Sequence, residues 1–216
     1  MRDALSLSHF RRRVADNYAS ARAAGGGAEA WTAWRADRDA LFASHPQSPV
    51  PEGARAAFGG MRFFPHDPSW RLTAMVEPIS TDVRGASPVP DAPPGSGAPP
   101  SGVSSPDGEF RFIGTAVAAR GGDEIRLPLL WLDAYGGGLF LPFRDVTNGE
   151  ETYGGGRYLL DQAKGADLGA TDDGRLVLDF NYAYHPSCAH DPRWTCPLAP
   201  IDSVVPMPVR AGEMAP

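Results

Sequence analysis

Hydrophobic residues in the first part of the chain recur at helical spacing. Phe10, Val14 and Tyr18 follow one another at intervals of four, which is the repeat of one helix face. Ser8 precedes this repeat and is a residue type that favours a helix N-cap, and three glycines at 25–27 end it. The pattern therefore predicts a first helix that ends at the glycine run.

A second helix is predicted directly after those glycines. Trp31, Trp34, Leu41 and Phe42 lie close to helical spacing, and the proline-rich stretch "SHPQSPVP" ends the pattern because proline lacks the amide donor. A short third helix is predicted over 52–58, closed by two glycines. We expect the aromatic faces of these helices to pack on the rest of the protein.

From Met61 onward the pattern changes to short runs of alternating residues, which is typical of strands. Glycine-rich turns such as "GGD", "YGGG" and "TDDG" join the runs, and such short connections favour antiparallel hairpins over helical crossovers. The sequence predicts an α+β fold in which N-terminal helices pack outside an antiparallel β-barrel or sandwich. The predicted strands cover 61–64, 71–77, 110–118, 125–132, 139–146, 157–160 and 176–180.

One segment departs from this pattern. Between Pro78 and Gly108, 19 of 31 residues are proline, glycine or serine, so the segment has little apolar surface to bury. We interpret its centre, 84–101, as a mobile surface loop. The strands before it have too little core to fold separately, so we expect one domain over 1–216, with a helical part at 1–58 and a β-rich part at 61–216.

Composition and charge narrow the classes of function. The chain of 216 residues has 42% hydrophobic residues and a net charge of −6, which is the balance of a folded, soluble protein. An acidic chain without a clustered basic stripe argues against nucleic-acid binding. The N-terminus has no signal-peptide pattern and no apolar run has membrane-spanning length, so we expect a cytoplasmic protein that does not bind membranes.

Several long motifs carry a family resemblance. Together with "HPQSPVP" and "FFPHDPSWR", the stretch "GGGLFLPFRDVTNGEETYGGGRYLLD" resembles the domain of unknown function 1684 family of bacteria and archaea. The resemblance extends over nearly the whole chain, but it implies no particular activity. Members of that family often carry asparagine at the position of His185 and an aromatic residue at that of His190, which argues against a metal site built on those two histidines.

Two histidines and two cysteines are concentrated near the C-terminus. His185, Cys188, His190 and Cys196 are ligand types for zinc, but their H-x2-C-x-H-x5-C order is not a standard zinc signature, and we expect no metal. Cys188 with a histidine nearby could instead be a nucleophile, if a neighbouring group lowers its thiol pKa. Packing thiols in a proline-stiffened loop, or a disulfide between the two cysteines, are the other readings.

A candidate ligand site follows from the stretch "ETYGGGRY". Three glycines can turn several amides toward one point, and an adjacent arginine can bind a carboxylate or phosphate with two donors. One alternative is that the glycines form an ordinary wide turn. Another is that Arg144 and Arg157 belong to a structural ion-pair network with Asp145 and other carboxylates. The Walker ending is absent and we expect no cofactor. The predicted ligand-binding residues are Arg144, Tyr153, Gly154, Gly155, Gly156, Arg157, Asn181, Tyr184, His185 and Cys188.

These features favour a soluble module that binds a small polar or anionic metabolite at the mouth of the barrel. A small enzyme that uses Cys188 with His185 or His190 is one alternative, and a structural or interaction protein is another. The sequence leaves the oligomeric state and the identity of the ligand open.

Overall fold

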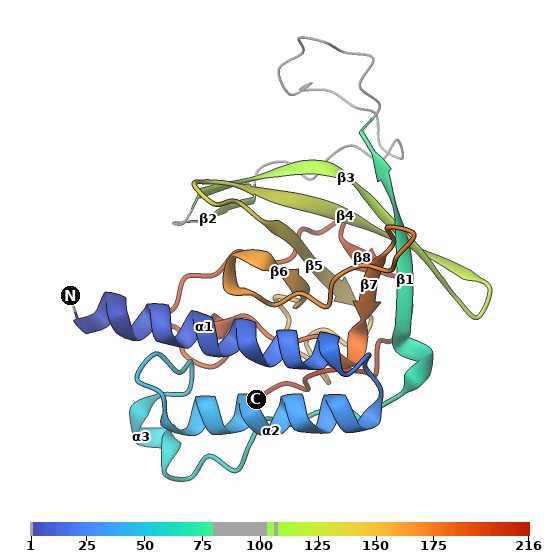
Figure 1. Ribbon diagram of the computed structural model, residues 1–216. Helices are drawn as coiled ribbons and strands as arrows, with labels where there is room; N and C mark the ends of the chain where they lie inside the picture. Colours follow the sequence, from blue (N-terminus) through green and yellow to red (C-terminus); the bar gives the residue numbers. More distant parts are fainter. Residues whose placement is uncertain (1, 80–102, 106–107) are drawn as a thin grey trace.

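A computed structural model describes residues 2–79, 103–105 and 108–216. In it three N-terminal helices precede the strands, and Figure 1 shows the helical part beside a curled sheet. This α+β arrangement confirms the fold class predicted from the sequence. The predicted surface loop at 84–101 lies outside the described residues. Among the helices that the structure describes, none is both long and apolar enough to cross a membrane.

The helices follow the predicted pattern, with two differences: the first begins earlier, and the third, predicted over 52–58, ends at Arg55. They are α1 (Arg2–Ala23), α2 (Ala28–Ser44) and the short α3 (Glu52–Arg55). Ser8 lies inside α1, so its prediction as the N-cap was wrong. The residues before Ser8 extend the helix, but Leu5 and Leu7 among them are exposed and do not join the spacing-of-four repeat from which the start was inferred, so periodicity could not locate this end.

The strands form one curled sheet in the described part of the chain, with the order β6-β5-β4-β3-β1-β7 and antiparallel pairing along this path. β2 pairs with β3, and β8 runs parallel to β5. The strands are β1 (Arg71–Pro78), β2 (Val103–Ser105), β3 (Gly108–Arg120), β4 (Asp123–Asp133), β5 (Leu139–Asp145), β6 (Arg157–Asp161), β7 (Leu176–Asp179) and β8 (Val204–Val205).

The two ends of this half-barrel approach each other. Tyr158 in the edge strand β6 exchanges two backbone hydrogen bonds with Tyr184, which follows β7 at the opposite edge.

The strand predicted at 61–64 is reduced to a single bridge between Phe63 and Glu213. Phe63 packs instead against the indole rings of Trp31 and Trp34, so helix packing replaces strand pairing there.

Two hydrophobic layers hold the helices and the sheet together. The larger cluster joins buried side chains from several strands of the sheet and the segments that follow them, and includes Leu127, Phe143 and Phe180. A second cluster lies between the helices and the sheet, and contains Tyr18 and Trp34 from the helices with Tyr182 from the segment after β7. The predicted docking of the helices through their aromatic faces is therefore confirmed, and α1 lies along one open side of the sheet (Figure 1).

Candidate functional site

Arg157 begins β6 and lies completely inside the protein, with no exposed surface. Its Nη2 donates to Asp145 Oδ1 at 3.1 Å and to the carbonyl oxygen of Val209 at 2.8 Å. Its Nη1 donates to the carbonyl oxygens of Ala211 and Glu213. Both terminal nitrogens of the guanidinium are therefore bound, to the Asp145 carboxylate and to carbonyls of the C-terminal segment. This arrangement corresponds to the ion-pair alternative from the sequence, and it leaves no free pair of donors for a ligand in this structure.

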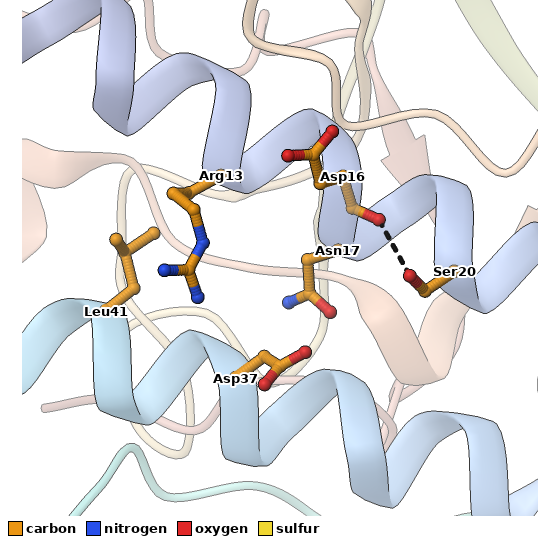
Figure 2. Close-up of a pocket in the computed structure, with 6 residues that line it drawn as sticks. All are labelled: Arg13, Asp16, Asn17, Ser20, Asp37 and Leu41. Carbon is orange, nitrogen blue, oxygen red and sulfur yellow. Dashed lines mark hydrogen bonds between the residues drawn. The ribbon is translucent and has the colours of Figure 1, made fainter.

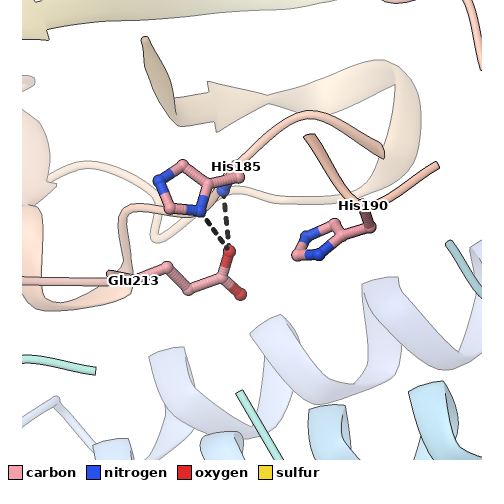
Figure 3. Close-up of side chains that lie close together, drawn as sticks. All are labelled: His185, His190 and Glu213. Atoms are coloured by element: carbon pink, nitrogen blue, oxygen red, sulfur yellow. Dashed lines mark hydrogen bonds and ion pairs between the residues drawn. The ribbon is translucent and has the colours of Figure 1, made fainter. Parts of the chain in front are cut away.

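Glu213 forms a second buried junction in the same C-terminal segment (Figure 3). One carboxylate oxygen, Oε1, accepts from Arg38 Nε at 2.7 Å, and the other, Oε2, accepts from the backbone N–H of His185 at 2.7 Å. Burial alone would raise the pKa of Glu213, but Arg38 and the neighbouring imidazoles lower it overall. Glu213 therefore stays ionised and joins helix α2 to the loop after β7.

His185, His190 and Glu213 bring possible metal-ligand atoms within 4.8 Å of one another, so this group has to be tested as a metal site. His185 Nε2 accepts a hydrogen bond from the backbone N–H of Tyr153 at 3.2 Å. Burial lowers the pKa of His185 to about 3, so the ring is neutral and its one proton must lie on Nδ1, which faces Glu213 Oε2 at 3.7 Å. A protonated nitrogen has no lone pair for a metal, so His185 does not fit as a ligand here.

The glycine run at 154–156 is shaped by close packing. A Cβ on Gly155 would overlap the ring of Tyr153, and one on Gly156 would lie 2.6 Å from Phe143 O. Gly156 also has a φ of +89°, which favours glycine. The run therefore permits tight chain packing, and the carbonyl of Gly154 accepts from Arg144 Nη1 at 2.9 Å. Arg144 donates also to Ala199 O, so both arginines of the predicted site bind backbone carbonyls.

The remaining predicted polar residues also have internal partners. Asn181 is buried, exchanges hydrogen bonds with the backbone of Asp67 and donates to Asp179 Oδ1 at 2.8 Å. The hydroxyl of Tyr184 donates to Asp161 Oδ2 at 3.3 Å. The structure brings Tyr153, His185 and Cys188 together, whereas Asn181 lies on the side of Asp67 and Trp31. Their ligand-binding role stays a prediction, but each residue named here already has at least one protein partner.

Cys188 and Cys196 are both reduced and half-buried. Burial, followed by the neighbouring Cys196, raises the pKa of the Cys188 thiol to about 11, which is the opposite of the lowering that a nucleophilic cysteine needs. Within the described part of the chain, neither thiol is hydrogen-bonded to an imidazole. The geometry therefore gives no support to the alternative of an enzyme built on Cys188 and histidine.

Two hollows lie on the helix α1 side of the molecule. The smaller one, between α1 and α2, has a volume of about 70 Å³, which suits a few water molecules rather than a metabolite (Figure 2). Its polar walls include both Arg13 and the carboxylates of Asp16 and Asp37.

The larger hollow, which we call the α1 cleft, has a volume of about 380 Å³, within the range of small-molecule sites. It lies where α1 meets the turn between β4 and β5 and the 3₁₀ turn η2 (Gln162–Lys164) after β6. Its lining residues are Arg11, Phe110, Leu132, Ala134, Tyr135, Gly136, Gly137, Phe140, Asp161, Gln162, Ala163, Lys164 and Pro197.

None of the ten ligand-binding residues predicted from the sequence lines the α1 cleft. The sequence contained two signals for it. The first is the densest basic run of the chain, which contains Arg11 and which the sequence alone suggests to be a solvated helix face. The second is Tyr135 in a glycine-rich hairpin turn, where the structure leaves its side chain fully exposed. Neither signal indicates that the helix and the hairpin meet, because that contact is set by the tertiary fold.

Comparisons with known proteins agree with this architecture. No curated protein matches the chain. A solved structure that does match is the solution NMR structure of an uncharacterised protein from gene locus rrnAC0354 of Haloarcula marismortui, with a TM-score of 0.56 and 31% sequence identity. The match covers 85% of this chain and 91% of the other. The model of the protein family of unknown function DUF1684 matches residues 56–214, and the chain belongs to that family.

Proposed function

We propose that the protein binds a small anionic molecule with a flat apolar part in the α1 cleft. The observation that carries this proposal is the composition of one cavity of about 380 Å³, in which two basic residues lie beside aromatic rings. Sites of this kind commonly combine apolar walls with a few polar groups that fix the orientation of the ligand. The proposal keeps the ligand class favoured by the sequence and moves the site away from the glycine run.

The basic residues of the cleft differ in how strongly they are already neutralised. Lys164 Nζ lies 3.1 Å from Asp161 Oδ2, so part of its charge is balanced inside the wall. Arg11 lines the cleft on an exposed face of α1, and it makes no ion pair with a carboxylate of the described residues. The guanidinium of Arg11 is therefore the group we expect to bind a carboxylate or phosphate, through two parallel hydrogen bonds.

Aromatic side chains supply the apolar wall. The rings of Phe110 and Phe140 lie 4.6 Å apart between centroids, and together they line the sheet side of the cleft. Tyr135 projects from the turn at the rim with its whole side chain exposed, so it can close over a flat group without first breaking a packed contact. An aromatic anion therefore suits the cleft, because its charge can pair with Arg11 and its ring can pack against these aromatic side chains.

Calorimetric titration with phenyl phosphate, benzoate and benzyl alcohol tests the proposal. We expect the two anions to bind and the neutral alcohol to bind at least ~10-fold more weakly, because the alcohol cannot pair with Arg11. Arg11→Gln should weaken phenyl phosphate binding by ~10-fold. Arg12→Gln is the matched control, because it removes the same charge from the same helix at a residue outside the cleft. Equal weakening by both variants, or equal binding of the alcohol and the anions, would contradict the proposal.

A further inference from the structure

Cys188 and Cys196 approach each other closely across a loop. The backbone N–H of Cys188 donates to the sulfur of Cys196 at 3.3 Å, over a sequence separation of eight residues. The sulfur of Cys188 is only three covalent bonds from that amide nitrogen, so rotation about its Cα–Cβ bond moves it over the same small region. The fold therefore holds the two sulfurs in one neighbourhood.

Contacts near each cysteine hold this arrangement in place. The residue after Cys196, Pro197, accepts a hydrogen bond from the hydroxyl of Tyr158 in β6. Between the cysteines, Arg193 Nη2 donates to Ser48 O at 3.1 Å, which attaches the loop to the segment after α2. Beside Cys188, the hydroxyl of Tyr153 lies 3.9 Å from the thiol sulfur. The two thiols thus do not depend on a random closure of the loop to meet.

We propose that Cys188 and Cys196 are a redox modification site that forms a reversible intramolecular disulfide by exchange with a low-molecular-weight disulfide of the glutathione type. Both side chains are half-buried, so a small disulfide can reach them from solvent. The inference is independent of ligand binding in the α1 cleft, because it depends only on the geometry of the two thiols.

The exchange proceeds in two balanced steps. One cysteine loses its proton to water and attacks a sulfur of the oxidised glutathione, which releases one glutathione thiolate and leaves a mixed disulfide on the protein. The second cysteine loses its proton and attacks the protein sulfur of that mixed disulfide, which releases the second glutathione. Two electrons pass from the two protein thiols to the small disulfide, and one S–S bond is exchanged for another.

The high pKa of the Cys188 thiol defines the kind of redox site this is. A thiol with a pKa of about 11 is almost entirely protonated at neutral pH, so its attack is slow. Cys188 is therefore suited to a stoichiometric couple that follows the surrounding redox state, and not to the fast attack that a catalytic dithiol requires of its nucleophilic cysteine.

Equilibration of the intact protein with glutathione buffers at pH 8.5, followed by intact-mass measurement and peptide mapping, tests the site. We expect the wild-type protein to lose two hydrogens and to give one peptide pair joined through Cys188 and Cys196. Cys188→Ser and Cys196→Ser should each instead retain one bound glutathione, because the resolving thiol is missing. Wild-type protein that keeps two free thiols in excess oxidised glutathione, accumulates mixed disulfide, or forms covalent dimers would overturn the proposal.

The same equilibration in concentrated urea separates native geometry from chance encounter. A pre-positioned pair should have an equilibrium constant with glutathione at least ~10-fold larger in the native protein than in the unfolded chain. A smaller constant in the native protein would mean that the fold opposes the bond, and would overturn the inference even if some disulfide forms.

Discussion

The carboxylate of Glu213, near the end of the chain, accepts a hydrogen bond from Arg38 Nε of helix α2 at 2.7 Å, and both side chains are buried. The guanidinium of Arg38 also lies 4.3 Å above the ring of Phe42 and 4.9 Å above that of Tyr184. This ion pair connects the helical layer to the C-terminal segment, which in turn surrounds Arg157. The C-terminal segment therefore binds the two layers of the fold together.

Breaking this pair should be costly. Arg38→Met leaves the Glu213 carboxylate buried without its cation, and we expect a loss of ~3–5 kcal/mol in the free energy of unfolding measured with urea. Glu151→Gln breaks the solvent-screened pair with Arg210 and serves as the control, with an expected loss much smaller than that of Arg38→Met. Similar losses for the two variants would show that Glu213 is not a buried junction.

Arg157 gives a prediction opposite to the one its sequence context suggests. As a ligand-binding arginine on the surface it could be replaced without loss of stability. In the structure its removal leaves the buried Asp145 carboxylate without its cation, and takes the arginine donor away from Asp145 Oδ1 and from three backbone carbonyls. We expect Arg157→Ala to lower the free energy of unfolding by at least ~3 kcal/mol. A variant of wild-type stability in urea denaturation would restore the reading of Arg157 as a free binding group.

Acid should weaken the fold through its buried histidines. Burial lowers the pKa of His185 to about 3, against about 6.5 in an unfolded chain. Between those values the unfolded chain binds a proton that the folded protein does not, so stability is fully present above pH ~6.5 and falls as the pH decreases. Inside this window His185 contributes a slope of up to ~1.4 kcal/mol per pH unit, and His190, whose pKa burial lowers also, adds to the slope in the same direction.

Urea denaturation at several pH values from 6.5 to 4.5 measures this slope. The lower limit of this range equals the ordinary pKa of Glu213, 4.5, so that carboxylate adds to the change only toward the acid end. His185→Asn, which removes the titrating ring and keeps a polar side chain, should reduce the slope by ~1.4 kcal/mol per pH unit. An unchanged slope would mean that His185 is protonated equally in the folded and unfolded states.

The glycine run allows backbone strain to be separated from packing. Gly156 and Gly149 have nearly equal φ values of +89° and +88°, but a Cβ at Gly156 would lie 2.6 Å from Phe143 O, whereas one at Gly149 would meet nothing within 4 Å. Gly149→Ala should cost ~1–2 kcal/mol from its backbone angle alone. Gly156→Ala should cost at least ~1 kcal/mol more in thermal or urea unfolding, because overpacking adds to the strain. Equal costs would contradict the packing explanation.

Periodicity in the sequence predicted the elements better than it predicted their contacts. Arg144 and Asp145 are adjacent in β5, where successive side chains point to opposite faces, and the structure pairs Asp145 with Arg157 while Arg144 binds carbonyls. The carbonyls that surround Arg157 come from 209–213, more than fifty residues away, and no local pattern encodes their approach. The glycines at 154–156 resembled a flexible anion-binding loop for the same reason, because the close packing that requires them involves residues that the local sequence does not reveal.

The most direct measurement of the proposed function is an amide ¹H–¹⁵N NMR titration of the protein with phenyl phosphate. The account predicts that saturable shift changes gather at Arg11, at Tyr135, Gly136 and Gly137, and at Gln162 to Lys164, which together line the α1 cleft. Shift changes centred on 153–157 and Cys188 would return the binding site to the glycine run. The absence of saturable changes anywhere would contradict binding of an aromatic anion in the cleft.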